Sequence, residues 1–504
     1  MKIRQLSTLL ITLIAIQAFT FLTFLDNSYA QTNPDVYVGI DISYGDVAEA
    51  KAMMDQVSSF TNLFVVGTSK ITWYPDKLNE TFDYAYEKGL SFISLPPPLP
   101  TYSSTFLNKT EWYRYAENRW GNSLLGFYYL DEPGGRQLDG ARQLTGNLSS
   151  ENSYDDAANR FTTVLSQEID SDWRDAYAYK SFTSDYALYW FDYQAGYDTV
   201  FAELGWNYSR QLNIALCRGA ATAQNKDWGA IITWTYTAPP YIESGEELYN
   251  DLILAYDNGA KYIVIFDGNE GWTGGILQPE HLDALQRFWN YIQSKTRQNN
   301  PVNERTAYVL PDAYGYGFRG PEDHIWGLWE ADSLTHNITI SVASLLNDYG
   351  EKLDILYDDG LQPGNNYGYK NLVYWDSYIP SPPEISILSP ENKTYAENNV
   401  NLTFTINKPV TWIGYSLDDQ ARVTVSGNIT LTNMPIGLHD ITVYAKDELE
   451  TTGTSETIHF DVNPPVSVEP FPTGLAVAVS LVSMAFIGAS LMMLFKKQET
   501  KKSA

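Results

Sequence analysis

The chain has a single cysteine, Cys217, and five histidines in 504 residues. One cysteine cannot form an intramolecular disulfide, so the chain lacks the cross-links that large secreted eukaryotic domains normally carry. The histidines are scattered, and there is neither an HExxH pattern nor a paired CxxC, which argues against a transition-metal site. A Gly-rich phosphate loop and a GxSxG elbow are also missing, so phosphate binding and serine acyl transfer are disfavoured. We therefore expect no metal and no cofactor.

Basic residues are also scarce. Lys and Arg total 33 against 61 Asp and Glu, which gives a formal net charge of -28 and a pI near 4.4. Proteins that bind a nucleic-acid backbone need clustered Lys and Arg, so we expect no nucleic-acid partner. Hydrophobic residues make up 44% and aromatic residues 14% of the chain, enough for a folded protein of two or three domains.

Both ends of the chain carry targeting patterns. Residues 1–30 combine Lys2 and Arg4 with an apolar run and a closing SYA, which predicts a cleaved signal peptide or, alternatively, an uncleaved anchor. Residues 474–495 are uncharged and close to the ~20 residues that cross a bilayer, so they predict one transmembrane helix. The basic tail 496–504 predicts a cytoplasmic C-terminus, with the bulk of the chain outside the cell membrane.

An extracellular location also agrees with the N-glycosylation sequons of the chain. Together with the shortage of cysteine, they favour an archaeal or bacterial cell surface over a eukaryotic one. The closing KKSA also fits a dilysine endoplasmic-reticulum retrieval signal, an alternative that the shortage of cysteine disfavours. The sequons begin at Asn79, Asn108, Asn147, Asn207, Asn337, Asn392, Asn401 and Asn428.

Residues 34–298 alternate short apolar strands with amphipathic helical stretches, the pattern of consecutive βα units on a parallel sheet. Their number and length predict a (β/α)₈ TIM-type barrel. The fifth strand, AYKSFTSD, is the least well marked, because Tyr186 to Tyr193 could itself be the strand. The eight expected strands are VYVGIDIS, NLFVVGT, LSFISLPPP, LLGFYYLDEP, AYKSFTSD, YDTVFAEL, GAIITWTY and KYIVIFDG.

Two smaller pieces and a stalk follow the expected barrel. Residues 301–380 predict a small α/β appendage that is too short for an independent enzyme and packs on the barrel. Residues 383–463 have period-two strands with Gly and Pro turns, which predicts an all-β sandwich, and they resemble the immunoglobulin-like modules of prokaryotic surface proteins. The Pro-rich residues 464–473 predict a stiff stalk between this sandwich and the membrane.

Acidic and aromatic side chains gather at the expected strand ends, the face of a βα barrel that carries its active site. Because side chains alternate along a strand, we expect Glu132 to reach the pocket and Asp131 to turn away and support it. We also expect Pro133 to hold Glu132 extended. The strand-end candidates are Asp41, Asp131, Glu132, Glu203, Trp234, Tyr236 and Asp267.

The segment YYLDEP resembles the Asp-Glu-Pro element of retaining glycoside hydrolases of the large (β/α)₈ clan. The resemblance implies that Glu132 is the acid/base and that a later strand-end Glu is the nucleophile. Glu203 is the expected nucleophile, with Glu243 as the competing candidate because the family's nucleophile usually follows strand seven. Glycosidic cleavage needs one protonated and one ionised carboxyl, and neighbouring aromatic rings favour the protonated form. The residues expected to bind the sugar are Asp41, Asp131, Trp206, Trp234, Tyr236 and Asp267.

The sequence therefore predicts a membrane-anchored cell-surface glycoside hydrolase that acts on extracellular glycan by two-carboxylate chemistry. The alternative is a non-catalytic surface protein that binds glycan or has a structural role. In that interpretation Asp131 caps the following loop and Glu203 pairs with Arg218. The two hypotheses differ in whether two carboxyls converge across the pocket.

Overall fold

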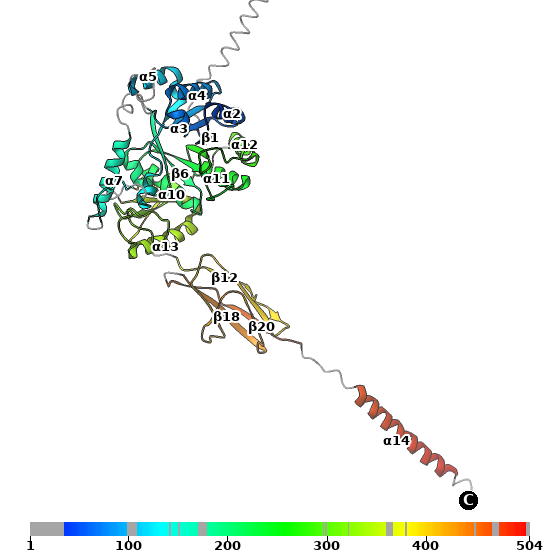
Figure 1. Cartoon of the computed structure of the whole chain (residues 1–504). Coiled ribbons are helices and arrows are strands. Elements are labelled where there is room, and N and C mark those ends of the chain that lie inside the picture. Colours follow the sequence, from blue (N-terminus) through cyan, green and yellow to red (C-terminus); the bar gives the residue numbers. More distant parts are fainter. Residues whose placement is uncertain are drawn as a thin grey trace, which may run out of the picture. The chain divides into compact units, whose positions relative to one another are not determined.

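A computed structural model gives the fold of most of the chain (Figure 1). It divides into two compact units, residues 1–380 and 381–504, which are described separately. The predicted signal peptide 1–30 lies outside the described residues, as do most of the predicted stalk and tail. The described residues are 35–97, 108–140, 143–149, 152–169, 179–295, 297, 300–320, 322–358, 366–378, 381–447, 450–465 and 473–499.

The first unit contains a closed barrel of eight parallel strands, which confirms the predicted barrel. Each strand pairs with the next one in the chain, and β8 pairs with β1 to close the ring. The strands are β1 (Tyr37–Ile42), β2 (Leu63–Val66), β3 (Ser91–Ser94), β4 (Leu124–Tyr128), β5 (Lys180–Asp185), β6 (Thr199–Leu204), β7 (Asp227–Ile232) and β8 (Tyr262–Asp267).

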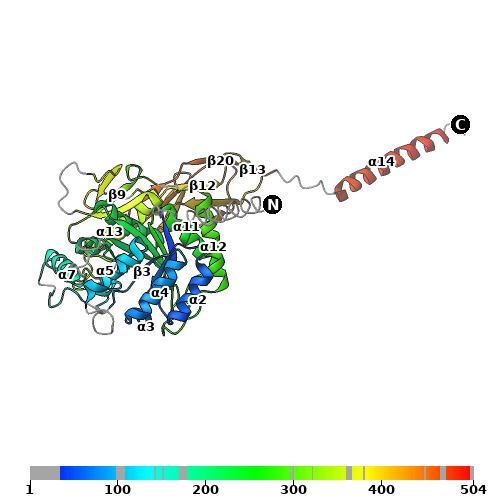
Figure 2. The same cartoon turned by 90° about the horizontal axis from the view of Figure 1, so that it is seen from above.

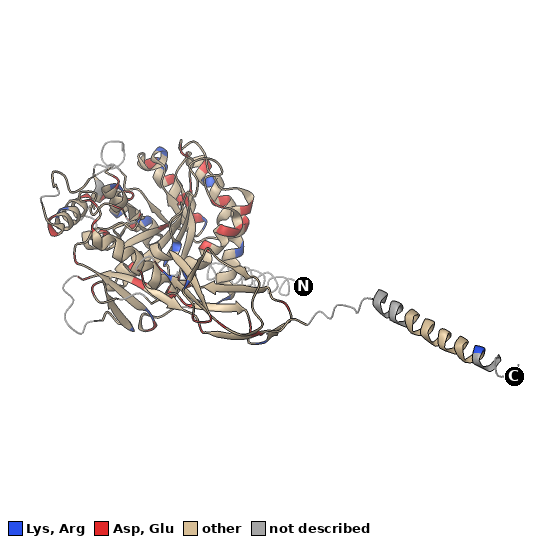
Figure 3. Cartoon of the chain, turned by 90° about the horizontal axis from the view of Figure 1, so that it is seen from below, with Lys and Arg blue, Asp and Glu red and all other residues tan. Residues whose placement is uncertain are grey.

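Helices surround the barrel (Figure 2). Acidic positions outnumber basic ones along them (Figure 3), in keeping with the net charge. The helices are α2 (Val47–Val57), α3 (Ser69–Thr72), α4 (Pro75–Glu87), α5 (Lys109–Trp120), α6 (Pro133–Leu138), α7 (Tyr154–Glu168), α9 (Tyr189–Ala195), α10 (Arg210–Ala223), α11 (Gly245–Asp257) and α12 (Pro279–Ser294).

Alternation along the strands decides which side chains face the inside of the barrel. Phe182 of β5 and Phe201 of β6 belong to the apolar cluster that fills the interior. Side chains two positions further along a strand point the same way, so Ser184 and Glu203 also face inward, at the carboxyl ends of their strands. The alternation of side chains therefore places the polar groups of Ser184 and Glu203 at the carboxyl-terminal end of the interior apolar cluster.

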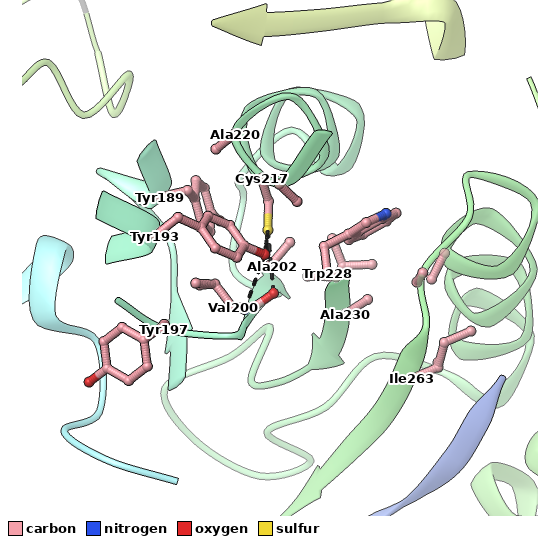
Figure 4. Close-up of a cluster of buried hydrophobic side chains, with 14 of the residues drawn as sticks. Tyr189, Tyr193, Tyr197, Val200, Ala202, Cys217, Ala220, Trp228, Ala230 and Ile263 are labelled. Carbon is pink, nitrogen blue, oxygen red and sulfur yellow. Dashed lines mark hydrogen bonds between the residues drawn. The ribbon is translucent and has the colours of Figure 1, made fainter. Parts of the chain in front are cut away.

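The segment that follows β5 is a helix and not a strand. β5 ends at Asp185, and α9 runs over Tyr189–Ala195, so the predicted fifth strand is confirmed and the alternative strand over Tyr186 to Tyr193 is wrong. In the cluster of Figure 4, α9 and α10 pack over β6, with Tyr189 and Tyr193 beside Cys217. Burial raises the pKa of the free Cys217 thiol well above its usual range, so this thiol is an inert part of the core.

A small α/β layer packs against α10 of the barrel. Its elements are β9 (Thr306–Leu310), α13 (Ser333–Tyr349), β10 (Leu353–Tyr357) and β11 (Asn371–Tyr374), and the parallel strands lie in the order β10-β9-β11. Arg218 of α10 donates to Asp354 of β10 at 2.7 Å, and Arg305 donates to the other oxygen of the same carboxylate at 2.5 Å. All three side chains are buried. Arg218 therefore pairs with Asp354, and the pairing with Glu203 that the non-catalytic alternative offered is wrong.

The second unit is a β structure of two sheets around one apolar core. One sheet has the order β12-β14-β17; the other has the order β13-β20-β18-β15-β16, with β19 beside β18. The resemblance to immunoglobulin-like modules stays a prediction. The strands are β12 (Ile385–Ser389), β13 (Thr394–Tyr395), β14 (Val400–Ile406), β15 (Trp412–Leu417), β16 (Val423–Val425), β17 (Ile429–Leu431), β18 (Gly437–Lys446), β19 (Thr452–Thr454) and β20 (Ile458–Val462).

The last helix, α14, runs over Thr473–Glu499 and contains the predicted membrane-spanning segment 474–495. Its described side chains, from Leu481 to Lys496, are exposed. Within the described part of the chain, no helix reaches the length and apolar character needed to cross a membrane, so the predicted transmembrane helix is not found there.

Candidate active site

A pocket of about 530 Å³ lies at the carboxyl ends of the barrel strands. Its volume is typical of small-molecule sites, and this end of a βα barrel is where such enzymes carry their chemistry. Four predicted site acids line it: Asp41 from β1, Asp131 and Glu132 after β4, and Glu203 from β6. The structure therefore brings both predicted catalytic carboxyls into one pocket.

The segment after β4 does not continue as a strand. Glu132 has φ 50° and ψ 53°, a left-handed conformation, and Pro133 is the first residue of α6. The expectation that Pro133 holds Glu132 extended is therefore wrong. The strict alternation of a strand ends with β4 at Tyr128, so Asp131 and Glu132 both line the pocket and Asp131 is not turned away. A left-handed residue other than glycine costs about 1–2 kcal/mol, which surrounding contacts must offset.

Those contacts come from the end of β5. The carboxylate of Asp185, which is fully buried, accepts hydrogen bonds from the backbone amides of Gly134 at 2.5 Å and Gly135 at 2.9 Å. The Glu132 amide donates to Ser184 O at 3.1 Å. A Cβ on Gly134 would lie 2.6 Å from Ala187 O, so only glycine lets the two segments approach this closely. Asp185 thus anchors the turn that carries Glu132.

Four polar side chains form a hydrogen-bonded row on the pocket wall. Tyr128 Oη donates to Asp131 Oδ1 at 2.6 Å and lies 2.8 Å from Ser184 Oγ. Ser184 Oγ lies 2.8 Å from Glu203 Oε1. On the other side, Arg136 of α6 pairs with Asp131 at 2.7 Å and lies 3.6 Å from Glu132. Asp131 and Glu203 are therefore the two ends of one connected row.

Burial and neighbouring negative charges favour the protonated forms of Glu132 and Glu203. Burial, followed by the charges of Asp131 and Asp185, raises the pKa of Glu132 to about 7, although Arg136 opposes the shift. Burial, followed by the charges of Glu132 and Asp131, raises the pKa of Glu203 well above its usual range. The charge of Glu132 thus disfavours ionisation of Glu203, so the protonated form of the buried Glu203 carboxyl is favoured.

Asp41 is the third acid with a raised pKa in the pocket. Burial, followed by the charges of Asp131 and Asp267, raises its pKa to about 8. A Cβ on Gly67 would lie 2.6 Å from Asp41 Oδ1, so the β2 end packs closely over this carboxyl. Asp41 is therefore a neutral hydrogen-bonding group at neutral pH.

Aromatic rings also line the pocket, from the ends of β6, β7 and β8. Trp234 stacks on Trp272 with ring centroids 6.2 Å apart and meets Trp206 edge-on at 6.3 Å. Trp206 and Trp272 both have left-handed backbones, with φ 46° and 54°. Trp272 is 50% exposed and borders the pocket mouth. The predicted placement of Trp206 and Trp234 in the pocket agrees with this geometry.

Three other candidates do not line this pocket. Asp267 follows Phe266, which lines the pocket, so by alternation it points outward, where it accepts from the amides of Ile276 and Leu277. Tyr236 lies in the turn after β7 and is 47% exposed. Glu243 is held by Arg210 at 2.9 Å on the loop before α11. Burial, followed by the charge of Asp251, raises the pKa of Glu243 to about 8.

Several pocket groups were not predicted from the sequence. Ser184, Arg136 and Trp272 line the pocket, and Asp185 supports it. The inward position of Ser184 could have been found by counting two residues on from Phe182. The role of Asp185 could not, because it depends on the close approach of two loops. In the described ranges no group of three or more His, Cys, Asp or Glu side chains is arranged to hold a metal ion.

Comparisons with known proteins leave the family open. No family model matches the chain, and no curated protein matches it. Among solved structures, a β-glucuronidase of Parabacteroides merdae is 9% identical, with 85% of this chain and 50% of that chain covered and a TM-score of 0.25. A mutant O-GlcNAc hydrolase of Thermobaculum terrenum is 13% identical over 53% of this chain and 61% of that chain, with a TM-score of 0.27.

The fibronectin(III)-like modules of Clostridium thermocellum are 18% identical over 16% of this chain and 98% of that chain, with a TM-score of 0.15. The chain thus covers less than two thirds of the length of either hydrolase. At these TM-scores the likenesses carry no argument about function.

Proposed function

We propose that this protein is a glycoside hydrolase whose two catalytic carboxyls are Glu132 and Glu203. The observation that supports the proposal is that both side chains line one pocket at the carboxyl end of the barrel and that the charge of Glu132 raises the pKa of Glu203. Hydrolysis of a glycosidic bond uses such a pair, one carboxyl protonated and one ionised. The resemblance of YYLDEP to the retaining hydrolases implies the roles: Glu132 is the acid/base, and the later strand-end glutamate, here Glu203, is the nucleophile.

In that assignment Glu132 gives its proton to the leaving oxygen and Glu203 attacks the anomeric carbon. Water then cleaves the glycosyl-enzyme bond, with Glu132 accepting the proton of the water. Glu132 is suited to exchange with solvent, because its side chain is 30% exposed, whereas Glu203 is 4% exposed. For attack, Glu203 must first be ionised.

The aromatic wall supports a sugar ligand. Trp206, Trp234 and Trp272 line the same pocket as the acids and offer flat apolar faces against which pyranose rings stack. Lys70 and Arg136 are the basic side chains of the pocket lining, and Arg136 already pairs with Asp131. Neutral or basic sugars are therefore the proposed substrates, and uronates are disfavoured by the acids.

The proposed location is the outer face of the cell membrane, with the substrate an extracellular glycan. This part of the proposal is supported by the sequence: the signal-like residues 1–30, the apolar run 474–495 and the basic tail 496–504. Protease added to intact cells should remove the barrel and spare the tail.

The decisive experiment incubates the full chain with a panel of polysaccharides and aryl glycosides. Hydrolysis that is lost in Glu132→Gln and in Glu203→Gln would support the pair. The leaving group separates the roles: if Glu132 is the acid, Glu132→Gln retains activity on glycosides of acidic phenols, which need no protonation, whereas Glu203→Gln does not. Glycan binding without any hydrolysis would reject the enzyme and favour a glycan-binding surface protein.

A further inference from the structure

The row that connects Asp131 with Glu203 contains three oxygen–oxygen contacts. They join Asp131 to Tyr128 at 2.6 Å, Tyr128 to Ser184 at 2.8 Å, and Ser184 to Glu203 at 2.8 Å. Tyr128 Oη also accepts the Ser184 backbone amide at 3.1 Å. These are hydrogen-bond lengths, and each such contact between two oxygens needs one proton.

The hydroxyls of Tyr128 and Ser184 carry too few protons for the three contacts of the row. Tyr128 and Ser184 carry one proton each, and three contacts need three. If Tyr128 donates to Asp131 and Ser184 donates to Glu203, the contact between Tyr128 and Ser184 has no proton. The third proton must therefore belong to one of the two carboxyls at the ends.

Glu203 is the end that holds this proton. Its side chain is 4% exposed, whereas the Asp131 side chain is 50% exposed and paired with Arg136. Burial and the neighbouring charges raise the pKa of Glu203, as described above. The row then runs in one direction: Glu203 donates to Ser184, Ser184 to Tyr128, and Tyr128 to Asp131. The titratable groups that act on Glu203 are Glu132, Asp131, Asp185, Tyr128, Tyr189 and Tyr208.

We propose that Tyr128 and Ser184 form a proton relay through which the buried carboxyl of Glu203 exchanges its proton with the exposed carboxyl of Asp131. In one transfer Glu203 gives its proton to Ser184 Oγ, Ser184 gives its own to Tyr128 Oη, and Tyr128 gives its own to Asp131 Oδ1. The products are an ionised Glu203, a protonated Asp131 and two unchanged hydroxyls. Asp131 then releases the proton to water.

The role of the relay in catalysis rests on the proposed function. A sugar in the pocket excludes the water that could otherwise deprotonate Glu203. The relay runs along the pocket wall and ends at Asp131, whose side chain is 50% exposed. It therefore provides the route by which Glu203 becomes the ionised nucleophile while the substrate is bound.

The test removes one hydroxyl at a time and measures the ionisation of Glu203 without any substrate. The infrared band of the protonated Glu203 carboxyl, assigned by its loss in Glu203→Gln, is titrated in the full chain. When Glu203 is protonated, it donates to Ser184 and Ser184 donates to Tyr128. Tyr128→Phe removes the acceptor of Ser184 and so destabilises the protonated form of Glu203. The titration midpoint of Glu203 should therefore fall. Ser184→Ala removes the donor to the ionised form, so the midpoint should rise. A merely structural disturbance would not move the two midpoints in opposite directions.

Tyr189→Phe is the matched control. Tyr189 is a buried tyrosine of the same unit (Figure 4), and its hydroxyl has no hydrogen-bond partner among the described residues. Burial raises the pKa of Tyr189 well above its usual range, so its hydroxyl stays neutral while Glu203 titrates, and the loss of this hydroxyl should leave the midpoint unchanged. Shifts of the same sign in Tyr128→Phe and Ser184→Ala, or no shift in either, would overturn the relay.

Kinetics on a cleaved glycoside give the second readout. Both relay variants should lower kcat by roughly 10- to 100-fold, which is at or below the lower end of the ~10²- to 10⁴-fold that a positioned proton-transfer group contributes, with KM changed less than about threefold. If the wild-type chain cleaves no glycoside but the midpoints still move in opposite directions, the relay stands and the proposed hydrolase fails. If the chain cleaves glycosides and the midpoints do not move, the relay alone is rejected.

Discussion

The two ends of the barrel treat acidic side chains differently. At the amino ends of β5 to β7, Lys180 pairs with Asp227 at 2.5 Å and Lys226 pairs with Asp198 at 3.1 Å. At the carboxyl ends four acids share a pocket in which Arg136 pairs with Asp131 at 2.7 Å and with Glu132 at 3.6 Å, and Asp41 and Glu203 have no ion pair among the described residues. Acidic side chains of one barrel are thus paired with lysines at its amino end, whereas at its carboxyl end they share a pocket in which burial and neighbouring charges favour the protonated forms of Asp41, Glu132 and Glu203. This contrast distinguishes ordinary ion pairs from groups placed for proton chemistry.

The largest expected effect tests this contrast directly. Glu132→Gln and Glu203→Gln should each lower the rate of glycoside hydrolysis by on the order of a hundredfold to ten-thousandfold, because each removes a titrating proton or a nucleophile. Asp227→Asn makes the same kind of change at the other end of the barrel and should leave kcat within about twofold, as expected of a surface ion pair. Steady-state kinetics on the best substrate checks both. A large loss in Asp227→Asn would remove the functional distinction between the ends.

Asp185→Asn should have the next largest effect. Its carboxamide cannot accept from all the amides that the Asp185 carboxylate holds, so the turn that carries Glu132 loosens. We expect kcat to fall roughly 10- to 100-fold, because small misplacements of a catalytic group cost this much. Removing the charge of Asp185 should also lower the pKa of Glu132 from about 7, which moves the basic limb of the kcat profile to lower pH.

Asp198→Asn is the control for that variant. Asp198, like Asp185, accepts a hydrogen bond from a backbone amide, that of Ser181, at 3.0 Å. Ser181 lies at the amino end of β5, whereas Asp185 lies at its carboxyl end. It should lower stability without moving the pH profile. A shifted profile in Asp198→Asn would show that Asp185 acts through general destabilisation and not through Glu132.

Trp272→Ala tests whether the aromatic side chains of the pocket bind the ligand, while the acids carry the chemistry. Losing part of the apolar surface that faces the ligand should raise KM by roughly threefold to tenfold and leave kcat nearly unchanged. Trp73→Ala is matched in exposure, 51% against 50%, and Trp73 does not line the pocket, so its KM should not change. Equal effects of both changes on KM would remove Trp272 from the binding wall.

The smallest expected effect is on stability. Asp41 has a pKa of about 8 in the folded chain and about 4 when unfolded, so the folded state binds its proton more tightly. The free energy of unfolding should therefore fall as the pH rises from about 4 to about 8. Asp41→Asn, which mimics the protonated form, should raise the melting temperature at pH 8 and have little effect at pH 4. An unchanged melting temperature at pH 8 would contradict a neutral Asp41.

Periodicity made part of the site predictable. Eight apolar strands with helices between them were enough for the barrel, and Glu203 and Asp41 face the pocket because each lies an even number of residues from an inward-facing apolar side chain. The same rule, applied to the last residue of β8, would have turned Asp267 away from the pocket. The prediction for Asp267 was wrong because it used only the position of the residue at the end of a strand. The direction of the side chain also depends on whether the residue lies an even or an odd number of positions from an inward-facing side chain.

Other features depend on contacts between segments that the sequence does not pair. The left-handed turn at Glu132 is stabilised by Asp185 of β5, which accepts hydrogen bonds from the amides of Gly134 and Gly135. The prediction of an extended Glu132 used only the neighbouring Pro133 and was therefore wrong. The row through Tyr128 and Ser184 crosses from β4 to β5 in the same way. Such cross-strand partners become visible only once the register between the strands is known.

The buried cluster of Arg218, Asp354 and Arg305 limits how the protein can be shortened. A chain cut after α12 would keep Arg218 in the surface of the barrel but lose the carboxylate and the backbone carbonyls that it binds, which come from residues 351–354. Of the groups that Arg218 binds among the described residues, the cut chain would keep Asn258 but not the carboxylate, and breaking a buried ion pair by removing one partner is strongly destabilising. The eight-stranded barrel, although geometrically complete, is therefore not a module that can be excised. Recombinant or evolutionary truncation should respect a boundary after the α/β layer and not one at the end of the barrel.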